Sequence, residues 1–315
     1  MIKIEAEDIK EFIKKYYLLL LVLIMFIAST FMHGAFLTEQ NIKNMLGANG
    51  AVAIVSIGMF FVILTGGIDL SVGSVIALSG SLTAGLLNVG VPWSLTIIIV
   101  LMLMAIPGLI SGLLVTVGKI TPIMVTLAMM IIIRGIAYIY QTGSPSLIRS
   151  FPIVFMGQGD LLQIPMPLIL LVVITIPSYF FLHKTSMGRK IYAIGGNKKA
   201  ALLSGIRVNR YIVLTYVLSS VLAGLAGIIL AGRIMMGSAI VGEGYELNAI
   251  AAVVIGGAAL DGGSGFVLNV ILGAFVMGIV SNILNLIGVS TYFQMMISGL
   301  IIVGAVFAAR KMSDE

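Results

Sequence analysis

Apolar residues dominate the chain in long runs, and only short polar stretches separate one run from the next. A helix needs about 20 mostly apolar residues to cross a hydrocarbon layer about 30 Å thick. The runs that approach this length are Tyr16–Phe36, Asn49–Thr65, Val72–Asn88, Trp93–Thr116, Pro122–Tyr140, Met166–Leu182, Tyr211–Ala231, Leu247–Leu260, Phe266–Ile287 and Tyr292–Ala309. The pattern therefore predicts an all-α polytopic membrane protein with about ten transmembrane helices, some of them short or broken.

The composition supports this prediction and removes other classes of protein. Of the 315 residues, 60% are hydrophobic and 10% are charged, whereas soluble domains have about 45–50% apolar and about 25% charged residues. A soluble enzyme and a nucleic-acid-binding module are thereby excluded. The chain has no cysteine, which excludes disulfides, iron–sulfur clusters and thiolate zinc sites. No connection is long enough to fold alone, so we expect one membrane domain over residues 1–315.

The basic residues indicate which way the chain crosses the bilayer. Lysine and arginine accumulate on the cytoplasmic side of membrane proteins. A cytoplasmic N-terminus with about ten crossings places most of the 18 basic residues inside. These residues are Lys3, Lys10, Lys14, Lys15, Lys119, Lys184, Arg189, Lys190, Lys198, Lys199, Arg207, Arg210, Arg310 and Lys311. We therefore expect both termini to be cytoplasmic, and the net charge of +6 needs no nucleic acid to explain it.

Two segments, 65–74 and 256–265, interrupt the apolar pattern with a Gly-Gly pair and one aspartate each. Irregular backbone at membrane depth must be shielded by protein or line a cavity, and paired glycine-interrupted segments point to a transport pathway. The alternative is a tight cytoplasmic turn in which Asp69 or Ser71 caps the next helix. Both interpretations can be true, since the glycines and their irregular backbone would form the pathway while the Asp69 carboxylate caps the helix.

Arg134 is the only basic residue inside a predicted span. An ionised side chain within the bilayer is costly and usually functional. The alternatives are a structural pair inside the protein, or a side chain that extends toward the outer interface. The sequence does not decide between them.

The residues that catalysis would require are missing. The chain has no phosphate-binding GxxxxGK[ST] loop, its histidines are only His33 and His183, and acidic residues are nearly absent from the spans. We therefore expect no enzyme activity, no cofactor and no metal site in this chain. An ion-coupled carrier also lacks the buried acid that it would normally need.

The connection 183–210 is predicted to be cytoplasmic and to carry a short helix. Asn197 can cap this helix, Ala200–Leu203 are strong helix formers, and Gly205 can end it in a left-handed turn. A short helix with an apolar side outside the bilayer fits a groove on a partner. The alternative is that it rests on anionic lipid through its lysines.

Four stretches together resemble a known family: 66–74, 188–206, 244–257 and 285–290. Their text is similar to that of the ribose-type sugar permeases of bacterial ATP-binding-cassette (ABC) importers, and the likeness runs from about 48 to about 309. The resemblance implies an all-helical subunit with about ten spans in the bacterial cytoplasmic (inner) membrane. It also implies cytoplasmic ATPase subunits that bind ATP and Mg, a periplasmic or lipid-anchored sugar-binding protein, and a second permease copy.

The resemblance implies import of a monosaccharide, most of all ribose, by alternating access driven by the ATPase subunits. Other sugars, polyols, nucleosides or branched-chain amino acids remain as alternative solutes, and an ion-coupled secondary carrier is a further alternative. The expected substrate pathway contains Gly66, Gly67, Asp69, Ser71, Thr126 and Asn248. The expected coupling helix contains Asn197, Ala200, Ala201, Leu202, Leu203, Ser204, Gly205 and Ile206.

Overall fold

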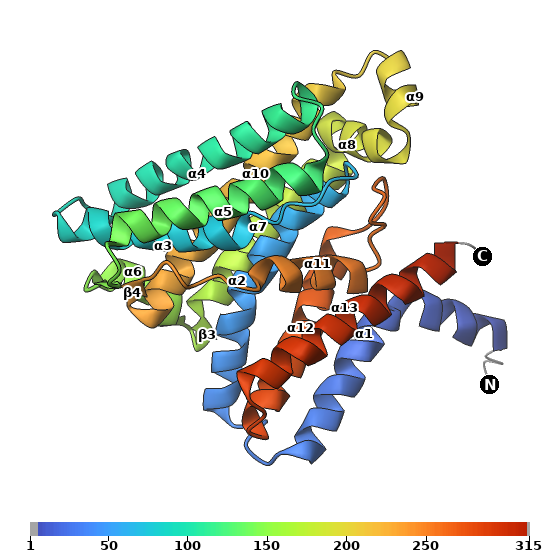
Figure 1. The fold of residues 1–315 in the computed structure, drawn as a ribbon. Coiled ribbons are helices and arrows are strands. Elements are labelled where there is room, and N and C mark those ends of the chain that lie inside the picture. Colours follow the sequence, from blue (N-terminus) through green and yellow to red (C-terminus); the bar gives the residue numbers. More distant parts are fainter. Residues whose placement is uncertain (1–5, 314–315) are drawn as a thin grey trace.

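The computed structural model describes the backbone of residues 6–313 and the side chains of residues 16–304, 306 and 307. The chain is almost entirely helical (Figure 1). The helices are α1 Ala6–Met32, α2 Glu39–Ile63, α3 Val72–Asn88, α4 Trp93–Thr116, α5 Pro122–Gln141, α6 Phe151–Gln158, α7 Met166–Lys184, α8 Ser186–Gly196, α9 Lys198–Leu203, α10 Val208–Ile234, α11 Tyr245–Ile255, α12 Val267–Leu286 and α13 Thr291–Ser313. Four two-residue strands form two antiparallel pairs, β1 (Ser146–Leu147) with β4 (Met236–Gly237) and β2 (Asp160–Leu161) with β3 (Ile164–Pro165).

The predicted class, a polytopic helical membrane protein, is confirmed. Within the described residues, six helices are long and apolar enough to cross a membrane: α2, α4, α5, α7, α10 and α12. The other predicted runs lie in the shorter apolar helices Tyr16–Met32, Val72–Asn88, Tyr245–Ile255 and Thr291–Gly304. The number of crossings and the side of the termini stay predictions, and the side chains of the terminal basic residues lie outside the described part.

Helix α11 is shorter than its predicted run, because the chain leaves the helix at Ile255 instead of Leu260. At 1.5 Å per residue, its 11 residues span about 16 Å, which is about half of the hydrocarbon layer. A glycine-rich turn follows, and α12 begins at Val267. The segment therefore has the dimensions of a half-membrane helix.

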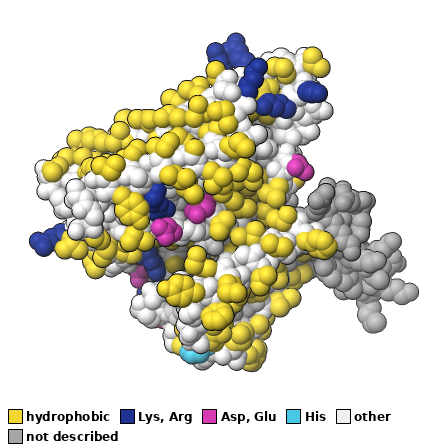
Figure 2. All heavy atoms as spheres, in the orientation of Figure 1, with side chains coloured by type: hydrophobic (Ala, Val, Ile, Leu, Met, Phe, Trp, Pro, Cys, Tyr) yellow, Lys and Arg dark blue, Asp and Glu magenta, His cyan; other side chains and the backbone are white. Residues whose placement is uncertain are grey.

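Helix α10 lies at the centre of the molecule and packs against α2, α3, α4 and α6. It approaches α4 closely, since a Cβ on Gly108 or Gly112 would meet the α10 backbone at Tyr216 or Val213. The outward sides of α4 and α5 are rich in exposed Leu, Ile and Met side chains, and that of α7 in exposed Val, Ile and Phe. Figure 2 shows apolar side chains over most of the visible face, with lysines and arginines gathered at the end that carries α8 and α9.

The two ends of the helix bundle differ in structure. Helices α8 and α9 lie at one end, and α6 with the short strands lies at the opposite end (Figure 1). The connection after α5 forms α6, which packs against α10 and α7. Lys43 at the start of α2 forms ion pairs with Glu39 (2.9 Å) and with Asp160 of β2 (2.9 Å). The end opposite α9 is thus covered by α6 and the short strands.

Candidate functional site

The first glycine-rich segment turns the chain from α2 into α3 at the end of the molecule that carries α8. Gly66 has a φ of +74°, a left-handed conformation that ends helices and is easiest for glycine. Its N–H donates to the carbonyl of Ile63 (2.8 Å), and the N–H of Gly67 donates to Val62 (3.2 Å). A Cβ on Gly67 would lie 2.6 Å from the Tyr216 hydroxyl of α10. This turn therefore presses closely against the central helix.

The carboxylate of Asp69 holds this turn in place. Asp69 is 1% exposed; its Oδ1 accepts from the Ser71 N–H (3.1 Å) and the Ser71 hydroxyl (2.6 Å), and its Oδ2 accepts from the Ser219 hydroxyl on α10 (2.9 Å). The capping interpretation holds only in part for Asp69, whose carboxylate accepts the N–H of Ser71, the N-cap residue, and no N–H of α3 itself. It is wrong for Ser71, whose hydroxyl donates to Asp69 and caps nothing. Both carboxylate oxygens are occupied by protein donors.

Helix α5 is fastened to the same turn. The hydroxyl of Thr126 is fully buried and lies 3.1 Å from the carbonyl oxygens of both Ile68 and Pro122. Ser74, at the start of α3, donates to the carbonyl of Met130 (2.8 Å). The structure thus brings together most of the predicted pathway residues, namely Gly66, Gly67, Asp69, Ser71 and Thr126. Asn248 is half-buried on α11 and shares no hydrogen bond with this described cluster.

The two glycine-rich segments meet each other and α8. The N–H of Gly263 donates to the carbonyl of Leu64 at the end of α2 (3.0 Å). A Cβ on Gly195 of α8 would collide with the Leu64 carbonyl and with the N–H of Gly263. A Cβ on Gly262 would lie 2.8 Å from the Gly66 N. The three backbones can approach at this point because Gly195, Gly262 and Gly263 carry no side chain. We name residues 64–67, 195–196 and 261–263 the glycine junction.

A hydrogen bond adds a side-chain contact between α8 and the second segment. The Tyr192 hydroxyl donates to the carbonyl of Gly265 (3.0 Å), and burial raises the pKa of Tyr192 to about 12. The phenol therefore stays protonated and remains a donor at physiological pH. The imidazole of His183 stacks near Phe266, with ring centroids 4.4 Å apart. Among the described residues, no group of three or more His, Asp or Glu side chains is arranged to hold a metal ion.

The predicted short helix after α8 is present as α9. Asn197 caps it by accepting the Ala200 N–H on its side-chain oxygen (2.9 Å), and Gly205 follows it with a φ of +77°. Ala201 is buried against the protein, whereas Leu202 and Leu203 are 65% and 89% exposed. The helix thus presents two leucines at the end of the bundle. Its geometry is confirmed, and its coupling role stays a prediction.

The in-membrane charge of Arg134 is satisfied within the protein. Its Nη1 donates to the carbonyls of Ala239 (2.6 Å) and Val241 (3.0 Å), in the stretch before α11. Gln141, the last residue of α5, contacts the same stretch: its side chain donates to the carbonyl of Gly237 (2.5 Å) and accepts the Ala239 N–H (2.8 Å). Of the alternatives, the structure favours a structural pair, since α5 clamps residues 237–241. This arrangement does not test a further role in transport.

The sequence analysis did not single out three residues of this site: Gln141, Ser219 and Gly195. Gln141 and Ser219 act on segments 96 and 150 positions away in sequence, so no local pattern marks them. Gly195 had a visible signal, because it begins another Gly-Gly pair, inside the connection predicted to be cytoplasmic. That pair turns out to complete the glycine junction.

Comparison with known proteins places the chain in a family. Residues 41–306 match the family model described as branched-chain amino acid transport system / permease component. The ribose import permease of Bacillus subtilis is 43% identical over 92% of this chain and 91% of that protein. The ribose import permease of Escherichia coli K12 is 38% identical over 95% and 94%, and its D-allose transport system permease is 36% identical over 88% and 86%. No solved structure matches the chain.

Proposed function

Because the chain belongs to this family of transport permeases, and to its sugar-permease members, we propose that it is the membrane subunit of an ABC importer for a monosaccharide. Ribose is the first candidate, since the ribose permeases of two organisms are 43% and 38% identical to it over most of the chain. Other small sugars are the second candidate, because the D-allose and L-arabinose permeases of Escherichia coli are each 36% identical. We place it in the bacterial cytoplasmic membrane.

The proposed mechanism divides the work between this chain and its partners. Cytoplasmic ATPase subunits bind ATP and Mg and supply the energy, and an external sugar-binding protein delivers the solute. This chain, paired with a second copy, alternates between two packings that open to opposite sides. The proposed pathway residues are Gly66, Gly67, Asp69, Ser71, Thr126 and Asn248, and the proposed coupling residues are Asn197 and Ala200–Ile206.

The observation that carries the coupling proposal is the position of α9. Leu202 and Leu203 stand exposed at the end of the bundle, while α9 is joined by a single residue to α8 and so to the glycine junction. An apolar helix face that is uncovered by the protein itself suits a groove on a partner. Displacement of α9 by that partner would be passed through Gly195 to the end of α2 and to the turn between α11 and α12.

A charge on α9 tests this assignment. In the complex reconstituted with its ATPase and binding protein, Leu203→Glu is expected to reduce sugar-stimulated ATP hydrolysis at least tenfold, because a buried interface anchor is worth about 2 kcal/mol or more. Leu203→Met keeps an apolar side chain and should retain most of the stimulation. Normal stimulation in Leu203→Glu, with normal membrane insertion, would contradict the coupling role of α9.

Vesicles separate the importer from an ion-coupled carrier. Vesicles that contain only this chain should not accumulate labelled ribose under a proton or sodium gradient. Vesicles with the full set of partners should accumulate labelled ribose when ATP is enclosed. Uptake of labelled allose and arabinose by the same vesicles then measures the solute specificity. Uphill uptake by the chain alone would contradict the proposed class of transporter.

A further inference from the structure

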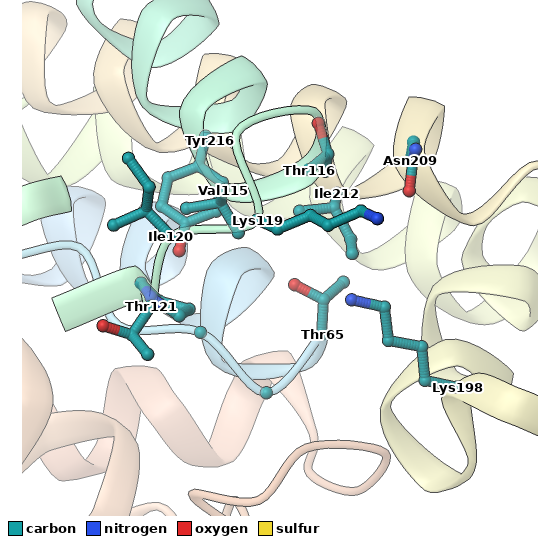
Figure 3. A pocket seen from close by; sticks show the side chains of 13 residues that line it. Thr65, Val115, Thr116, Lys119, Ile120, Thr121, Lys198, Asn209, Ile212 and Tyr216 are labelled. Carbon is teal, nitrogen blue, oxygen red and sulfur yellow. The ribbon is translucent and has the colours of Figure 1, made fainter. Parts of the chain in front are cut away.

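A partly open pocket of about 570 Å³ lies beside the first glycine-rich turn, between the α4–α5 connection, the start of α9 and α10. Its volume lies in the range of small-molecule sites, about 300–1,000 Å³. Figure 3 shows Lys119 and Lys198 extending into the same space, with Asn209 at its edge. The pocket is therefore shaped by two connections that lie far apart in sequence.

The pocket is positively charged and has no counter-charge. None of the residues that line it is Asp or Glu, and neither Lys119 nor Lys198 forms an ion pair with a described residue. Asn209 offers an amide donor at the edge of the same space, whereas the Thr65 hydroxyl already donates to the Val62 carbonyl (2.9 Å). Two ammonium groups with a neutral donor beside them match a group with several anionic oxygens, since hydrogen bonds to ionised acceptors are the stronger ones.

The backbone that carries Lys119 is unusual. Lys119 has a φ of +55°, which is uncommon for any residue other than glycine, and residues in such conformations cluster at functional sites. Hydrogen bonds from the flanking N–H groups of Gly118 to Leu113 (3.2 Å) and of Ile120 to Leu114 (3.3 Å) hold the turn. The connection from α4 to α5 is thus folded in a costly way that directs a lysine into the pocket.

The inner wall of the pocket contains an unsatisfied polar group. Tyr216 is 0% exposed, and its hydroxyl has no hydrogen-bond partner among the described residues. In Figure 3 this hydroxyl points toward the loop that carries Ile120 and Thr121. A buried donor without a partner is costly, and this one borders the pocket.

We propose that this pocket binds the phosphate group of a small anionic ligand. Lys119 and Lys198 neutralise the phosphate, and the side-chain amide of Asn209 donates to it from the edge of the pocket. Such a ligand is either a soluble phosphate ester or the headgroup of an anionic lipid. Lys119 lies beside the membrane helices and Lys198 on α9, so the bound phosphate links the two and favours the arrangement seen here. The site serves regulation, and the proposal does not depend on which solute is transported.

Binding to the purified full-length chain tests the proposal without any transport assay. In phosphatidylcholine nanodiscs, titration calorimetry should show that ribose 5-phosphate binds and that ribose binds at least tenfold more weakly. Lys119→Gln and Lys198→Gln should each weaken ribose 5-phosphate about tenfold, which is the loss of one charge-assisted contact. Lys199→Gln is the matched control, because Lys199 follows Lys198 on α9 and does not line the pocket. Lys119→Arg keeps the charge and should restore binding.

A second arm distinguishes the source of the phosphate. The same variants are placed in vesicles of phosphatidylcholine and phosphatidylglycerol in equal parts, and lipid retention is measured by native mass spectrometry after detergent extraction. Phosphatidylglycerol retained by the wild-type chain and Lys199→Gln, and lost from Lys198→Gln, supports the site with a lipid as its ligand. Binding of ribose 5-phosphate in phosphatidylcholine nanodiscs, without retention of phosphatidylglycerol, supports the site with a soluble phosphate ester as its ligand. The proposal is overturned if neither kind of binding depends on Lys119 or Lys198, or if ribose binds as strongly as its phosphate ester.

Discussion

Two glycine-rich turns of similar sequence meet beneath α8, and the protein holds them in different ways. In the first turn, Asp69 is buried and accepts three hydrogen bonds from Ser71 and Ser219. In the second turn, Asp261 is exposed and its side chain makes no hydrogen bond with the described residues. The second turn is held by backbone contacts and by the Tyr192 hydroxyl instead.

The difference shows which turn is the fixed one. Buried, fully hydrogen-bonded side chains join the first turn to α10 and α5, so it can move only with those helices. The second turn rests on Leu64 and Gly195 through backbone atoms that can separate without leaving a buried carboxylate unpaired. We therefore expect the second turn and α8 to move together against a first turn that stays in place.

The largest predicted effect is the difference in stability between variants of the two aspartates. Asp69→Ala leaves the Ser219 hydroxyl and the Ser71 N–H without their acceptor, and we expect a loss of about 3 kcal/mol in the free energy of unfolding. Asp261→Ala should change it by less than about 0.5 kcal/mol, as at other exposed positions. Denaturant unfolding of both variants in the same detergent measures the contrast. Equal losses would show that the two turns are held alike.

The next effect concerns the contact between the turns and α8. Gly195→Ala places a Cβ against the Leu64 carbonyl and the Gly263 N–H, and such overpacking costs about 1–3 kcal/mol. Gly196→Ala is the control, since a Cβ at Gly196 has no neighbour within 4 Å. We expect Gly195→Ala to lose sugar-stimulated ATP hydrolysis in the complex and Gly196→Ala to retain it. A fully active Gly195→Ala would mean that close approach at the glycine junction is not needed.

The smallest effect is at Tyr192, the side-chain attachment of the second turn. Tyr192→Phe removes its bond to Gly265 and should cost about 1 kcal/mol at neutral pH. The pKa of Tyr192 is raised from 10.0 to about 12 by burial, so the folded state favours the protonated phenol, and this preference is lost as the pH rises through that interval. Stability of the wild-type chain should therefore fall between about pH 10 and 12 more steeply than that of Tyr192→Phe. Parallel pH profiles would contradict the contribution of this phenol.

Several elements were predictable because local forces decide them. The bounds of α3 and α4 agree with the apolar runs Val72–Asn88 and Trp93–Thr116, and α9 follows from its cap and its final glycine. Helix α2 begins at Glu39, ten positions before the predicted Asn49. Its first turns are polar and lie outside the apolar run, so hydropathy gives no sign of them, although the Thr38 hydroxyl accepts the Asn41 N–H there (3.4 Å).

The site was only partly predictable, because its contacts join distant segments. The sequence pattern singled out Asp69 and the two glycine-rich segments. It did not predict that Asp69 contacts Ser219, or that the two glycine-rich segments contact each other. The partners of Arg134 were unpredictable for the same reason. They are the backbone carbonyl oxygens of residues 239 and 241, and every residue has such an oxygen. The packing of the helices determines which carbonyl oxygens lie within reach of Arg134, and no pattern of side chains in the sequence shows this.

The exposed leucines of α9 have a consequence for the lifetime of the subunit in the cell. Uncovered apolar side chains outside a membrane attract chaperones and proteases as well as legitimate partners. Copies synthesised in excess of whatever protein covers Leu202 and Leu203 should therefore be degraded first. If the proposed ATPase partner is what covers α9, we expect the abundance of this chain to follow the abundance of that partner.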